Sequence, residues 1–269
     1  MSDIQLTASM RSNLLSLQNT QGLMDTTQNR LSTGLKVNSA LDNPSAFFTA
    51  SSLNNRASDL NSLLDDIGQG IQTLKAADEG LQALTDLAEQ AKGLANQALS
   101  ESDTTTRSQL AASFDDLLSQ IDGLIDDTSY RGTNLLSGDS LEVKFNEDGT
   151  NAITVTGVTY DSAGLSISGA ASAWAANSNI NVAIADVNTA ITTLRNQAST
   201  FGSQLSTIQT REDFTKAMVA NLQEGASKLT LADSNEEGAN MLALQTRQQL
   251  GTISLSLASQ ASQSVLRLF

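Results

Sequence analysis

The feature that most constrains this 269-residue chain is an unbroken helical spacing over residues 184–229. From Ile184 to Leu229, positions recur in alternating steps of three and four residues, and all but Glu212 and Thr215 are non-polar or alanine. This spacing places every member on one face of an α-helix. Roughly 45 residues at 1.5 Å each would make a helix of about 70 Å. A chain with such a stripe needs a partner helix of similar length.

A second long stripe runs over residues 44–99 and supplies that partner. Asn43 can cap this helix, and Pro44, the one proline, fits its first position. A third helix is predicted over 107–127, with Asp115, Asp122 and their neighbours on an outward, solvated face. The fold class predicted is therefore mainly α, a bundle of long antiparallel helices.

Between the helix predicted over 107–127 and the stripe that starts at residue 184, the spacing of apolar residues changes to two. Apolar residues alternate over 141–145 and again over 153–160, and a turn at 146–149 separates them. We predict a small antiparallel β-hairpin, or a three-strand patch that includes 165–167. The turn faintly resembles a calcium loop, but the ligand spacing is missing and a hairpin turn is favoured. The glycine- and serine-rich stretch 161–179 is predicted to be the loosest part of the chain.

Charge is distributed unevenly. The chain carries a net −14, residues 1–41 are +1 and residues 238–269 are +2, so residues 42–237 carry −17. Charge-poor apolar stripes need to be covered, whereas an acidic surface stays in water. Gly34 is expected to end the first helix. The domains predicted are an inner coiled coil of 1–41 with 238–269, and an outer helical bundle of 42–237 whose variable segment is about 139–175.

Both ends repeat apolar residues at helical spacing. The first end has a heptad of modest strength with a half-polar seam, and the last end has two apolar faces. A helix that is apolar on two sides is expected to be covered on two sides, so we predict burial between copies of the chain. The predicted polymerisation residues are Leu6, Met10, Leu14, Leu17, Met24, Leu31, Met241, Leu244, Leu250, Ile253, Leu257, Val265, Leu268 and Phe269.

Composition excludes much chemistry. With no histidine and no cysteine, imidazole bases, thiol nucleophiles and zinc–thiolate sites cannot form. Neighbouring carboxylates such as Asp65 and Asp66 point about 100° apart on a helix, so they do not converge on a substrate. No enzyme activity, cofactor or metal is expected. The acidic balance argues against nucleic acid and anionic membranes, and no signal peptide or membrane-spanning segment is visible.

Several motifs, in order along the chain, resemble bacterial flagellin. They are RSNLLSL at 11–17, LSTGLKVNSALDNPSAFFTA at 31–50, YRGTNLL at 130–136 and ANMLALQTRQQLGTISLSLASQASQSVLRLF at 239–269. The run from Asn43 to Phe48 is similar to that of alphaproteobacterial flagellins. The resemblance covers the chain except for about 139–175, and the large outer domains of the family are lacking.

The resemblance implies a structural subunit that polymerises into the extracellular flagellar filament for swimming. It also implies export as an unfolded chain through the flagellar type III apparatus. The expected partners are other copies of the chain, the filament cap, the hook–filament junction protein and an export chaperone. Asp86 and Gln90 stand where enteric flagellins have an arginine and a leucine that contact the mammalian innate receptor, so we expect weak or no recognition.

Three alternatives remain at this point. The closest is a hook–filament junction protein, which shares the terminal coiled-coil design. An enzyme carried on a flagellin scaffold would need an inserted catalytic domain, and 139–175 is too short for one. A free-standing adhesin or toxin-like coiled coil would not polymerise on seeding.

Overall fold

The computed structural model describes residues 8–266, and it divides into two compact units. The terminal unit comprises Met1–Asn55 with Asn221–Phe269, and the central unit is Arg56–Ala220. The terminal unit contains both predicted terminal segments and adds residues 42–55 and 221–237 to them.

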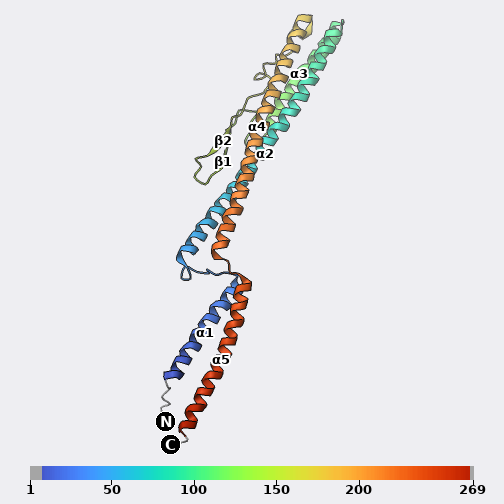
Figure 1. Ribbon diagram of the computed structural model, residues 1–269. Helices are drawn as coiled ribbons and strands as arrows, with labels where there is room; N and C mark the ends of the chain where they lie inside the picture. The colour runs from blue at the N-terminus through green and yellow to red at the C-terminus, as the bar shows by residue number, and fades with distance from the viewer. Residues whose placement is uncertain (1–7, 267–269) are drawn as a thin grey trace. The chain divides into compact units, whose positions relative to one another are not determined.

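Five long helices account for most of the chain (Figure 1). They are α1 (Ala8–Thr33), α2 (Pro44–Ser100), α3 (Thr104–Asp127), α4 (Asn177–Thr230) and α5 (Ser234–Leu266). The remaining elements are β1 (Leu141–Lys144), β2 (Ala152–Val155) and a single tight turn, η1 (Ala171–Trp174). The mainly α class with a small hairpin is thus confirmed. None of the helices within residues 8–266 combines the length and the apolarity that crossing a lipid bilayer requires.

The helix boundaries follow local chemistry. Asn43 accepts a hydrogen bond from the Ala46 amide (3.1 Å), and Pro44 is the first residue of α2, as predicted. Asp103 caps α3 by accepting from the Thr106 amide at 2.8 Å. Gly34 follows α1 with φ +71°, a conformation that favours glycine.

In the central unit, α2, α3 and α4 lie side by side around one apolar core (Figure 1). Every third or fourth residue of each helix is buried, which is what the predicted stripes require. The largest fully buried helix side chains are Ile67, Leu74, Leu81, Leu84, Phe114, Ile121, Ile180, Leu194 and Phe201.

Three helix starts differ from the prediction, and α3 begins at Thr104, three residues early. Helix α4 begins at Asn177, seven residues before the predicted start, because Ile180 and Ala183 continue its buried stripe backwards. The break predicted over 230–237 is shorter, since α5 already begins at Ser234. There, Asp233 accepts a hydrogen bond from the Asn235 amide at 2.8 Å and caps the helix.

The sheet has two antiparallel strands, with Leu141 opposite Val155 and Lys144 opposite Ala152. The hairpin is confirmed, but 165–167 does not add a third strand. Ser166 has φ +58°, which breaks an extended backbone, and a turn buries Leu165 and Ile167 instead.

One close approach in the central unit can be tested by mutation. A Cβ on Gly80 of α2 would lie 2.5 Å from Cγ2 of Thr128 and 2.9 Å from Cδ1 of Leu136. The Thr128 hydroxyl also donates to the Leu124 carbonyl (2.7 Å), so this side chain cannot turn away without losing a hydrogen bond.

We therefore expect Gly80→Ala to lower the free energy of unfolding of the central unit by about 1–2 kcal/mol, because overpacking outweighs the gain in helix propensity. The control is Gly123→Ala on α3, where a Cβ meets nothing within 4 Å. This variant should be more stable by up to about 1 kcal/mol. Chemical denaturation followed by circular dichroism measures both, and equal stabilisation by the two changes would contradict the packing argument.

Candidate assembly surface

Helices α1 and α5 lie side by side and run antiparallel (Figure 1). Along their seam, Met10 and Leu244 are buried, and Leu17, Met24 and Met241 are half-buried. Thr20 and Thr27 of α1 are buried as well, so the seam is half polar. At Gly251 of α5 a Cβ would lie 2.6 Å from Cδ2 of Leu17, so the missing side chain is what admits that leucine.

The two faces of α5 have opposite environments. Counting about 100° per residue, Leu242, Leu250, Ile253 and Leu257 fall within an arc of about 80°. Their exposed fractions are 67%, 63%, 56% and 61%. The opposite side carries the seam residues. Burial therefore divides this helix as the sequence pattern predicted, and we call these four leucine and isoleucine side chains the outer face of α5.

Helix α1 is also exposed on its outer side, but less regularly. Leu14 and Leu31 are 39% and 38% exposed, while Leu15 and Leu23 reach 59% and 52%. Among the described residues, nearly all large apolar side chains with this exposure belong to the terminal unit; Val182 and Phe214 are the exceptions. Each helix of an isolated pair can bury only the side that faces the other helix, so its remaining sides stay exposed to solvent.

The structure does not place all predicted polymerisation residues. Leu6, Leu268 and Phe269 lie outside the described residues, and so does the side chain of Val265. Conversely, Leu15, Leu23 and Leu242 were not predicted from the sequence, although they are as exposed as the predicted ones. Leu242 could have been found, because it lies eight residues before Leu250 on the same helix face.

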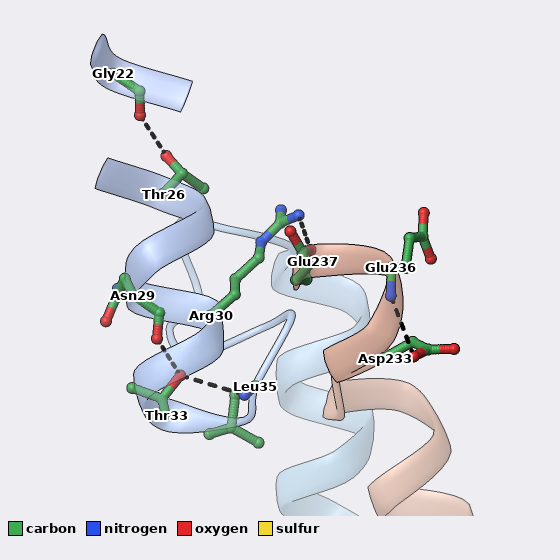
Figure 2. A network of polar contacts seen from close by, with 9 residues as sticks. All are labelled: Gly22, Thr26, Asn29, Arg30, Thr33, Leu35, Asp233, Glu236 and Glu237. Atoms are coloured by element: carbon green, nitrogen blue, oxygen red, sulfur yellow. Dashed lines mark hydrogen bonds and ion pairs between the residues drawn. The ribbon is translucent and has the colours of Figure 1, made fainter. Parts of the chain in front are cut away.

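An ion pair joins α1 and α5 at the end of the seam away from the chain termini (Figure 2). Arg30 Nη1 donates to Glu237 Oε1 at 2.9 Å, with side-chain exposures of 33% and 8%. Figure 2 shows Arg30 extending from the last turn of α1 to the first turn of α5. There the carboxylate also lies at the positive end of the α5 helix dipole. The pair fixes one helix against the other.

Beyond this ion pair the two connecting segments bind each other through their backbones. The amides of Lys36 and Val37 both donate to the Thr230 carbonyl (2.7 and 3.2 Å), and the Ala232 amide donates to Gly34 (3.0 Å). The segment from 34 to 43 is held further by Asp42. Its carboxylate accepts from the backbone amides of Ser39 and Asn38 and from the Ser39 hydroxyl, which lowers the pKa of Asp42.

The two predicted receptor positions, Asp86 and Gln90, are both exposed on α2 one helical turn apart. In the part of the chain that the structure describes, no cluster of three or more acidic residues is arranged to hold a metal ion.

Comparison with known proteins accounts for this arrangement. The family model of the bacterial flagellin N-terminal helical region matches residues 4–140, and that of the C-terminal helical region matches residues 184–269. The chain belongs to the bacterial flagellin family.

Relatives of this flagellin match nearly end to end. Flagellin FljM of Caulobacter vibrioides is 31% identical over 265 residues, covering 95% of both chains. A flagellin of Brucella melitensis is 27% identical over 282 residues, covering 100% of this chain and 99% of the relative. The crystal structure of Bacillus cereus flagellin shares the fold with a TM-score of 0.50 and 19% identity, covering 56% of this chain and 88% of that one.

Membership settles the class of the protein. It is a structural protein, a subunit that polymerises with other copies of itself into the extracellular flagellar filament, and not an enzyme. The prediction of a flagellin is confirmed, and the hook–filament junction protein is not favoured. Both family models describe helical regions, which is consistent with the coiled-coil design of the ends.

The ion pair between α1 and α5 can be tested in the full-length monomer. We expect Glu237→Gln to destabilise the helix pair by about 1–2 kcal/mol, because a charged hydrogen bond is lost but Arg30 can hydrate at its exposed side. Amide hydrogen exchange in α1 and α5 should then speed up by about tenfold.

Glu236→Gln is the matched control. Glu236 lies in the same first turn of α5, and its side chain is exposed. The substitution therefore removes the same charge near the helix N-terminus but leaves the ion pair of Arg30 with Glu237 intact. If both variants exchange alike, the effect belongs to the helix dipole and not to the pair.

Proposed function

We propose that this flagellin polymerises through the outer faces of α1 and α5, which neighbouring copies cover in the filament. The single observation that supports this most is the outer face of α5, where four large apolar side chains share one side and are all more than half exposed. Monomeric proteins rarely leave such a contiguous apolar face in water unless it serves an interaction.

Magnitudes favour the same proposal. Burying one leucine or isoleucine side chain stabilises by about 1.5–3 kcal/mol, so covering the outer face of α5 contributes on the order of 5 kcal/mol or more per copy. The ordering of α1 and α5 costs conformational entropy that their half-polar seam offsets only in part. The terminal helices therefore gain most of their stability when copies assemble.

The uneven distribution of charge along the chain supports different positions in the filament for the terminal helices and for residues 42–237. Residues 238–269 contain no acid and only two bases, so many copies of this segment can gather around one axis with little like-charge repulsion. Residues 42–237 carry −17 and favour a solvated position. We infer an inner layer of terminal coiled coil, residues 1–41 with 238–269, and an outer layer formed by residues 42–237.

Export and assembly partners extend the proposal. The chain is exported unfolded through the flagellar type III apparatus and folds at the growing tip. Absence of cysteine means that no disulfide hinders passage as an extended chain. The partners proposed are an export chaperone, the hook–filament junction protein on which the first copies assemble, and the filament cap.

An acid on the outer face of α5 tests the assembly surface. We expect Leu257→Asp to abolish filament formation, because a buried unpaired carboxylate costs several kcal/mol at every copy. The central unit should stay folded. Filament formation is measured by seeded polymerisation, sedimentation and electron microscopy. Folding of the central unit is measured by circular dichroism.

Two controls accompany this variant. Val182→Asp places the same charge on a similarly exposed apolar residue (56%) of the central unit, and Leu257→Met keeps an apolar side chain on the outer face. Both should polymerise. Normal filaments from Leu257→Asp would refute the assignment of this face to assembly.

Receptor recognition forms a separate prediction. With an acid at Asp86 and an amide at Gln90, we propose weak or no activation of the mammalian innate flagellin receptor. The double variant Asp86→Arg with Gln90→Leu restores the residue types of the enteric proteins and should raise the response by about tenfold or more, as expected for a repaired charge contact and apolar contact. A reporter-cell assay measures this, and an enteric-level response from the unaltered protein would contradict it.

A further inference from the structure

One segment of the central unit, residues 161–176, crosses helix α3 without forming a regular element except for the turn η1. It lies within residues 141–183, which neither flagellin family model covers. Its glycine- and serine-rich sequence predicted a loose connection. The structure instead gives it defined attachments to α3, and we call residues 161–176 the strap.

Two carboxylates of α3 bind the strap. Asp122 Oδ1 accepts from the Ser162 amide (2.6 Å) and Oδ2 accepts from the Ser162 hydroxyl (3.0 Å). Seven residues earlier, on the same helix face, Asp115 Oδ1 accepts from the Ala170 amide at 2.7 Å. The prediction of a solvated face agrees with the exposed side chain of Asp115, but it is wrong for Asp122, which is half-buried against the strap.

An apolar anchor holds the far end of the strap. Trp174, the one tryptophan of the chain, is fully buried, and its ring lies 5.0 Å from that of Phe114 on α3. Leu165 and Ile167 are buried nearer the start of the strap. These contacts give the closed strap its stability.

The closed strap also carries two unfavourable features. Ser172, Ala173 and Trp174 all adopt positive φ (52°, 47° and 55°), a left-handed conformation that side chains with a Cβ rarely adopt. In addition, the Trp174 indole N–H is buried without a hydrogen-bond partner. Both costs disappear as soon as the strap leaves α3, since the turn relaxes and water reaches the indole.

We propose that the strap is a latch that opens as a unit while the helices beneath it stay folded. Three attachments hold the strap closed: the hydrogen bonds to Asp115 and Asp122, and the packing of Trp174 on Phe114. The backbone strain at residues 172–174 favours opening. The strap has no regular hydrogen-bonded ladder to the helices. Its release also uncovers Leu165 and Ile167 and breaks the hydrogen bond that the Asn179 side chain donates to the Ala171 carbonyl (3.2 Å). Opening exposes Phe114 and the apolar side chains of the strap, and this inference does not depend on polymerisation.

The experiment uses the full chain as a monomer and the fluorescence of Trp174, excited beyond the tyrosine band. In a denaturant titration, red-shifted emission and acrylamide quenching of Trp174 should appear before the helical circular dichroism signal falls. Asp122→Asn should shift the fluorescence transition to lower denaturant and increase the open population by about tenfold, while leaving the helical transition in place. A single coincident transition for both signals would overturn the proposal.

A matched pair of alanines tests the strain separately. Ala173 has φ +47° and Ala175 has φ −59°, and both are exposed. Ala173→Gly should move the fluorescence transition to higher denaturant, since glycine accepts the left-handed turn, whereas Ala175→Gly should move it to lower denaturant because glycine gains freedom in the open strap. Equal shifts in the same direction would contradict a strained latch.

Discussion

The structure depends on a simple geometric constraint: two helices packed against each other can bury only one side of each. In the terminal unit, α1 and α5 meet this limit, and the outer face of α5 is left with side chains that water solvates poorly. The half-polar seam, with Thr20 and Thr27 buried between the leucines and methionines, adds little to offset it. Assembly is the natural way to cover what one chain cannot.

The central unit solves the same problem within a single chain. There α2 packs with α3 and α4, and the hairpin adds Val143 and Val155 to the core. Small residues allow these close contacts, as Gly80 does beneath Thr128 and Leu136. The surplus of acids on this unit then remains in water, whereas the terminal helices carry almost no net charge. Their different compositions thus correspond to different ways of burying apolar surface.

Much of the fold could be predicted because helical stripes are a local property. The start of α2 at Pro44, the stop at Gly34 and the two faces of α5 all follow from residue type and spacing. The start of α4 was predicted too late because Ile180 follows a serine- and asparagine-rich stretch that resembles a loop.

Contacts between distant residues could not be predicted in this way. Nothing near Arg30 in the sequence indicates Glu237, and nothing near Asp122 indicates Ser162. Both pairs depend on how the chain returns on itself. From sequence alone, an acid on the surface of a helix is predicted to be solvated, because the segment that covers it is not known. The same limit applies to the strap, whose composition indicated looseness but not its attachment to α3.

The central claim is that copies of this flagellin cover the outer face of α5 when they polymerise. Because the chain has no cysteine, Ile253→Cys introduces a unique thiol on that face, and Val182→Cys introduces one on the central unit as a control. The most direct measurement is the rate of maleimide labelling of each thiol in monomers and in filaments. We predict that the thiol at 253 reacts readily in the monomer and is protected by on the order of a hundredfold in the filament, as expected for burial between copies, while the thiol at 182 reacts in both. Equal labelling of the thiol at 253 in monomer and filament would contradict the account.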